Sequence, residues 1–77
     1  MKEELEYRSE KVRDYFNSIP VKSYMPLLVY ANLEIRNNEL LQRKIGRVMS
    51  GRINGTDGPV INEIEKAVDY LKEHGYK

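Results

Sequence analysis

The chain has 77 residues and a formal net charge of +1, with 40% hydrophobic and 32% charged residues. This length allows one domain, residues 1–77, and the apolar fraction is too high for a disordered chain. The absence of cysteine excludes a disulfide framework and a thiolate zinc site. No apolar run reaches the ~20 residues of a membrane span, and residues 1–11 lack the apolar core of a signal peptide. We therefore expect a cytoplasmic protein.

The spacing of apolar residues predicts an all-α bundle of four or five short helices, because no segment shows the alternation of a half-buried strand. The first helix is expected over residues 2–18, where Leu5, Val12 and Phe16 recur at helical spacing. Pro20 disfavours its continuation. The whole chain should form one helical domain.

A second, shorter helix is expected to start after Ser23 as N-cap and to fade near Leu33. Pro26 is tolerated in its first turn, because the amide hydrogen that proline lacks has no partner there. The third helix is expected over residues 39–50, with Asn38 as N-cap and Gly51 at the left-handed position that ends it.

The last helix has two possible starts. Asp57 can cap a helix that has Pro59 in its first turn, or Asn62 can cap one through a capping box with Glu65. Either helix runs to His74. Its expected buried stripe consists of Ile61, Ile64, Val68 and Leu71.

Basic residues concentrate in the middle of the chain. Residues 20–55 have a net charge of +4, against −1 for residues 1–19 and −2 for residues 56–77. A basic centre suits contact with a polyanion through one face of the fold.

A helical wheel of the third helix turns Leu41, Ile45 and Val48 to the core. Gly46 lies on the opposite face and costs about 1 kcal/mol relative to alanine within a helix. It allows close approach either of nucleic acid or of another helix. The outward face consists of Glu39, Arg43, Gly46, Arg47 and Ser50.

Residues 45–52, IGRVMSGR, and residues 63–76, EIEKAVDYLKEHGY, resemble the DNA-binding heads of lac-repressor-type regulators and phage-repressor-like helix-turn-helix domains. In those families the first pattern ends the recognition helix, and the second belongs to a helix that packs on it. The chain departs from them at Gly46, where the families usually have serine, and in the loop 53–60. Leu28 to Asn38 has no clear counterpart of the families' preceding helix and turn, so Asn37 and Asn38 would form the turn.

The resemblance implies a transcription regulator that binds double-stranded DNA. The residues expected to face base edges are Asn38, Glu39, Gln42 and Arg43, and those expected to hold phosphates are Arg47 and Arg52. It also implies a homodimer, for which the first helix is available as interface. The full set of candidate nucleic-acid-binding residues is Arg36, Asn38, Gln42, Arg43, Gly46, Arg47 and Arg52.

We expect no catalytic activity, metal, cofactor or small-molecule substrate, because no phosphate loop, nucleophile elbow or paired-carboxylate cleft is visible in the sequence. The alternative hypothesis is a helical protein–protein interaction module, an adaptor or inhibitor without DNA binding. The amphipathic first helix and the six tyrosines motivate that alternative, because tyrosine is enriched at protein interfaces.

Overall fold

The protein is described by a computed structural model covering residues 2–76, which contain five α-helices and no β-strand. The predicted all-α bundle is confirmed, with the fifth helix formed by a separate short turn of four residues. The helices are α1 (Lys2–Ser18), α2 (Met25–Ala31), α3 (Leu33–Arg36), α4 (Glu39–Met49) and α5 (Gly58–Glu73).

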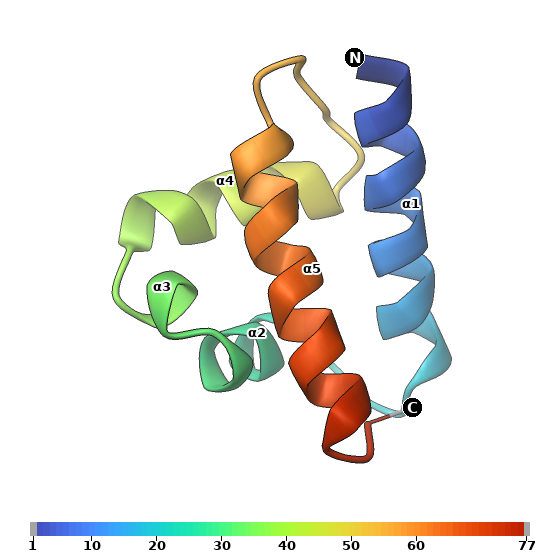
Figure 1. Ribbon diagram of the computed structural model, residues 1–77, viewed down its shortest axis with the longest axis vertical. Helices are drawn as coiled ribbons and strands as arrows, with labels where there is room; N and C mark the ends of the chain where they lie inside the picture. Colours follow the sequence, from blue (N-terminus) through green and yellow to red (C-terminus); the bar gives the residue numbers. More distant parts are fainter. Residues whose placement is uncertain (1, 77) are drawn as a thin grey trace.

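Helix α5 is the centre of the bundle (Figure 1). It lies beside α1 and also contacts α2 and α4, and α4 crosses it near its N-terminal end. Its predicted stripe is confirmed, since Ile61, Ile64 and Leu71 are fully buried and Val68 nearly so. One apolar stripe on α5 therefore organises the core that the other helices share.

Each of the other helices contributes buried apolar residues to the same cluster. Leu5, Val12 and Phe16 of α1 are buried as predicted, and Ile45 and Val48 of α4 are fully buried. These residues follow the spacing of one face of a helix, which explains why the prediction of the core was correct.

The start of α2 differs from the prediction. Its N-cap residue is Tyr24, whose side chain makes no capping hydrogen bond, so the assignment of Ser23 as N-cap was wrong. Pro26 lies in the first turn as expected. The helix ends at Ala31 because the backbone of Asn32 is extended.

The side chain of Asn32 explains the break between α2 and α3. Its Oδ1 accepts a hydrogen bond from the amide of Glu34 at 2.9 Å, which caps α3. Its Nδ2 donates to the backbone oxygen of Glu63 on α5, also at 2.9 Å. Asn32 is buried, so both contacts compensate its lost hydration and fix α3 against α5.

Helix α4 begins and ends as predicted. The side chain of Asn38 accepts a hydrogen bond from the amide of Leu41 at 3.0 Å. At the other end Gly51 has φ of 97°, and the amide of Arg52 donates to the backbone oxygen of Arg47. This is the left-handed ending that favours glycine.

Of the two predicted starts of α5, the earlier is confirmed and the capping box at Asn62 was wrong. Asp57 occupies the N-cap position, yet its side chain makes no capping hydrogen bond because it binds elsewhere. Gly75, with φ of 94°, follows the C-cap His74. Within residues 2–76, no helix combines the length and the apolar character needed to cross a membrane.

Candidate nucleic-acid interface

The outward face of α4 carries the candidate residues that the sequence singled out, and Arg43 is exposed on it. Among residues 2–76, its side chain forms no hydrogen bond or ion pair that meets ordinary distance limits. The guanidinium therefore keeps all five of its donors available to an external acceptor.

Gly46 lies beside this arginine without a close neighbour. A Cβ atom placed on Gly46 would have no atom within 4 Å apart from its own helix backbone and chain neighbours. One of the two uses expected for Gly46 was the close approach of another helix, and within the described residues no helix approaches it in this way. Close packing among the described residues therefore does not offset the helix-propensity cost of this glycine.

Arg47, one turn after Arg43, is used inside the molecule. Its Nη2 donates to Oδ1 of Asp57 at 2.7 Å, and its Nη1 donates to Oδ2 at 2.8 Å. Nη1 also donates to the backbone oxygen of Arg52 at 2.9 Å. The side chain is 27% exposed, so we remove Arg47 from the set of expected phosphate contacts.

Asp57 is only 2% exposed and is fully occupied by its partners. Its Oδ2 also accepts a hydrogen bond from the amide of Asn54 at 2.7 Å. The hydrogen bond from Arg47 lowers the pKa of Asp57 and outweighs the opposing effect of burial. The pair holds the 52–57 loop against the end of α4, and we call Arg47, Asn54 and Asp57 the loop clamp.

Arg13 of α1 also supports the end of α4. Its Nη1 donates to the backbone oxygen of Val48 at 3.2 Å and to Oγ of Ser9 at 3.4 Å. Carbonyl oxygens in the last turn of a helix lack helical partners, so a cation placed there is favourable. Sequence reasoning missed this contact, since Arg13 and Val48 are far apart in the chain.

Two other candidate residues hold the turn that precedes α4. Nε2 of Gln42 donates to the backbone oxygen of Ile35 at 2.8 Å, linking α4 to α3. Nε and Nη2 of Arg36 donate to the backbone oxygens of Val29 and Tyr30, at 3.1 and 3.0 Å. Gln42 thus fixes α4 to α3, and Arg36 fixes α3 to α2.

The remaining candidates lie at the two ends of α4. Asn38 is exposed, but its Oδ1 is occupied by the capping hydrogen bond. Arg52 is exposed and donates from Nε to Oγ of Ser50 at 3.2 Å. Among residues 2–76, the side chain of Arg43 thus has no hydrogen-bond or ion-pair partner and an added Cβ on Gly46 would meet no atom within 4 Å, whereas the other five candidates each have a local structural contact.

Lys44 is a further exposed cation on α4 and was not among the candidate residues predicted from the sequence. No group of three or more histidine, cysteine, aspartate or glutamate residues in residues 2–76 is arranged to hold a metal ion.

Comparisons with protein-family models, with curated proteins and with solved structures found no match to this chain.

Proposed function

We propose that this protein is a small cytoplasmic, repressor-like transcription regulator of the helix-turn-helix type, which binds double-stranded DNA with the outward face of α4. The observation that carries the proposal is that Arg43 has no ion-pair partner among residues 2–76 and that Gly46, on the same face, has open space where a Cβ would stand. A guanidinium with free donors, beside a helix position that has no side chain, can bind a phosphate or the edge of a guanine.

The charge distribution supports this choice of ligand. Of the exposed cations around α4, Arg36, Arg43, Lys44 and Arg52 form no ion pair among the described residues. The acidic residue nearest to them in the loop, Asp57, is neutralised by the loop clamp. Glu34 and Glu39 are also exposed in this region. The four unpaired cations less these two carboxylates leave a formal net charge of +2 toward solvent, which favours a polyanion.

The contacts of the other candidate residues support a positioning role. Gln42 and Arg36 bind backbone carbonyls of the preceding segments, and Asn38 caps the helix. A helix that is fixed at its start can present Arg43 at a constant angle. Recognition helices need such fixed placement, because their first turns meet the base edges.

The test is a fluorescence-anisotropy titration of labelled random duplex DNA with the purified protein, at low and at physiological salt. We expect micromolar binding that weakens with salt. Arg43→Ala should lower the affinity about tenfold and the salt slope by about 1. A control variant, Lys11→Ala, removes an exposed cation of α1 and should change neither quantity as much.

Arg43→Ala is preferred to a variant that also changes Arg47, since loss of the loop clamp would confound binding with unfolding. Absent binding at low salt, or equal losses for Arg43→Ala and Lys11→Ala, would contradict the proposal.

A second candidate function, a protein–protein interaction module, rests on an exposed aromatic cluster. The rings of Tyr30 and Tyr70 are 5.9 Å apart and those of Tyr30 and Tyr76 are 6.5 Å apart. All three are more than one-third exposed, and such tyrosines are typical of interfaces. Tyr30→Ser should weaken binding of a protein partner under this alternative, and Arg43→Ala should not.

A further inference from the structure

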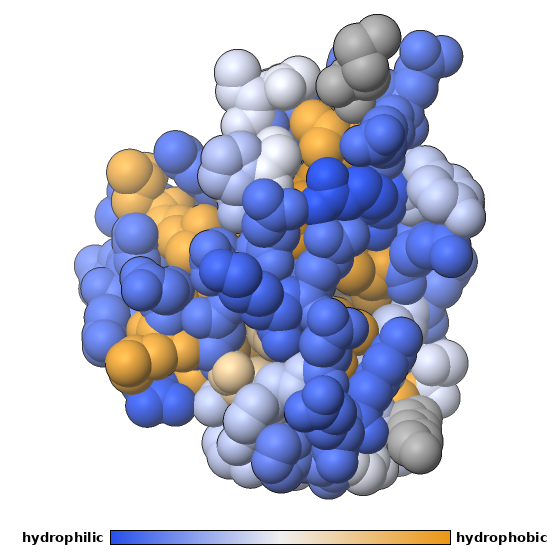
Figure 2. Space-filling model, viewed as in Figure 1, coloured by the Kyte–Doolittle hydropathy of each residue, from blue (hydrophilic) through white to orange (hydrophobic). Residues whose placement is uncertain are grey.

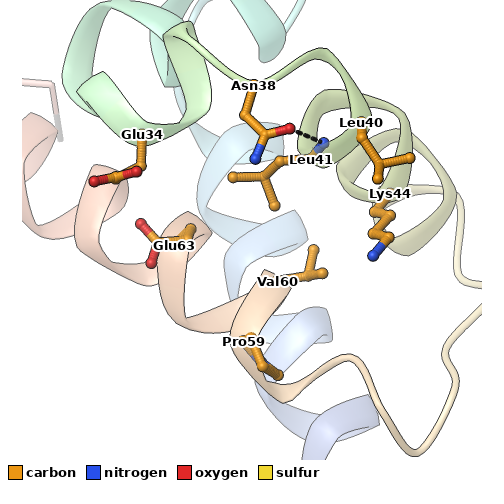
Figure 3. Close-up of a pocket in the computed structure, with 8 residues that line it drawn as sticks. All are labelled: Glu34, Asn38, Leu40, Leu41, Lys44, Pro59, Val60 and Glu63. Atoms are coloured by element: carbon orange, nitrogen blue, oxygen red, sulfur yellow. Dashed lines mark hydrogen bonds between the residues drawn. The ribbon is translucent and has the colours of Figure 1, made fainter.

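A groove of about 270 Å³ runs between α4 and α5, away from the outward face of α4 (Figure 3). Leu41 of α4 and Val60 of α5 line its middle. Val60 is 5% exposed and Leu41 is half-buried, so the floor is apolar. Leu40 stands at one side of the groove and is 59% exposed.

The two large aliphatic side chains that are exposed among the described residues lie on α3 and α4. Leu33 of α3 and Leu40 of α4 are the most exposed leucines, at 61% and 59%. Figure 2 shows orange areas on the left of the molecule, over α3 and the start of α4. Single exposed leucines are common on protein surfaces. Leu40, however, lines the apolar groove, and an exposed apolar side chain that continues an apolar groove indicates a contact surface.

The two ends of the groove carry opposite charges. Glu34 and Lys44 line it at opposite sides, as Figure 3 shows. Both are exposed, and neither forms an ion pair among residues 2–76. The other carboxylate in the groove, Glu63, already receives Nζ of Lys66 at 3.3 Å. Glu34 and Lys44 are therefore the two charges left to meet a partner.

We propose that this groove binds the same groove of a second copy of the chain, across a two-fold axis. In a two-fold interface each group meets its complement on the same surface of the other copy. The groove contains both members of each expected contact, an exposed leucine with an apolar floor and a lysine with a glutamate. Leu40 of one copy can cover the apolar floor of the other, and Lys44 of each copy can face Glu34 of its partner.

Helix α1, the dimer surface predicted from the sequence, exposes less hydrophobic surface suited to an interface core. Its only exposed large hydrophobic side chain among the described residues is Tyr7. The remaining exposed positions of α1 are mainly charged and include Glu3, Glu6, Glu10 and Lys11. Interface cores are depleted in such residues, which favours the groove.

A dimer formed through the groove leaves the outward face of α4 accessible. On a helical wheel of about 100° per residue, Lys44 lies about 100° from Arg43 and about 160° from Gly46. Leu40 lies about 60° and about 120° from the same two residues, at the border of the outward face. The dimer goes beyond the proposed DNA binding and does not depend on it. Its test therefore uses no DNA, and either proposal can fail while the other stands.

The decisive experiment is sedimentation velocity of the wild type and of two charge-reversal variants, Lys44→Glu and Glu34→Lys. Each variant alone places like charges opposite each other twice in the dimer, and we expect at least tenfold weaker self-association. In an equimolar mixture, each heterodimer regains two opposite-charge pairs, so association should return close to the wild-type level. The difference in association between the mixture and either variant alone should become smaller at high salt.

A pair of apolar substitutions checks the surface independently of charge. Leu40→Ser should weaken self-association, whereas Tyr7→Ser, at an equally exposed site on α1, should not. Circular dichroism should show unchanged helix content, because both side chains are exposed. The proposal is overturned if the wild type stays monomeric at millimolar concentration, if the mixture associates no better than either variant, or if only Tyr7→Ser weakens the dimer.

Discussion

Arg43 and Arg47 lie one turn apart on α4, and in the sequence they are alike in charge, shape and spacing. In the fold they differ completely. Arg47 binds the buried Asp57 through two hydrogen bonds and closes the 52–57 loop. Arg43 binds nothing among the described residues. The comparison teaches that position relative to a loop, and not residue type, separates a structural arginine from one available to a ligand.

The largest effect is expected from Asp57→Ala. This change leaves Arg47 without its buried partner and the amide of Asn54 without an acceptor. We expect the free energy of unfolding, measured by urea denaturation, to fall by about 2–4 kcal/mol. The control, Asp69→Ala, removes an exposed aspartate that has no ion pair among the described residues. It should change the free energy of unfolding by less than about 0.5 kcal/mol. Equal effects would mean that the loop clamp is not structural.

Acid should remove the contribution of the loop clamp. The pKa of Asp57 is lower in the folded state because Arg47 donates hydrogen bonds to its carboxylate. The resulting stability is fully present above the unfolded pKa of about 3.9 and is lost as the pH falls through the lower folded pKa. Urea denaturation of the wild type and of Asp57→Asn should therefore give a difference that is constant above about pH 5 and shrinks in stronger acid. A constant difference down to about pH 2 would contradict this.

Gly46→Ala should raise the free energy of unfolding by about 1 kcal/mol, because alanine favours the helix and the added Cβ enters open space. Gly51→Ala is the matched control, at the glycine that follows the C-cap of the same helix. Its φ of 97° strains any residue with a Cβ, so it should lower the stability. Thermal melts of both variants compare them directly. A loss of stability in Gly46→Ala would show that the helix needs glycine there.

The smallest effect on folding is expected for Arg43→Ala. The side chain is exposed and unpaired among residues 2–76, so unfolding in urea should change by less than about 0.5 kcal/mol. Arg47→Ala, the change one turn later, should cost several times more. Similar decreases in the free energy of unfolding for the two variants would show that the two arginines do not differ in their structural role.

Local patterns were sufficient to predict most of the fold. The spacing of Leu5, Val12 and Phe16 indicated α1, and Asn38 and Gly51 marked the ends of α4. Such signals depend on neighbours within one or two turns, so a sequence contains them directly. The separate helix α3 was not predicted as such, because Asn32 interrupts the chain through a contact with Glu63 on α5.

The candidate site was predictable only in part, for the same reason. The sequence by itself determined that a basic, glycine-containing helix would turn its apolar stripe inward and its arginines outward, because helical periodicity decides which residues share a face. Only the tertiary structure decided that Asp57 would engage Arg47 and leave Arg43 free, and that Leu40 and Lys44 would border a groove with α5. These contacts depend on where the 52–57 loop and α5 lie against α4, and the packing of the whole chain determines those positions.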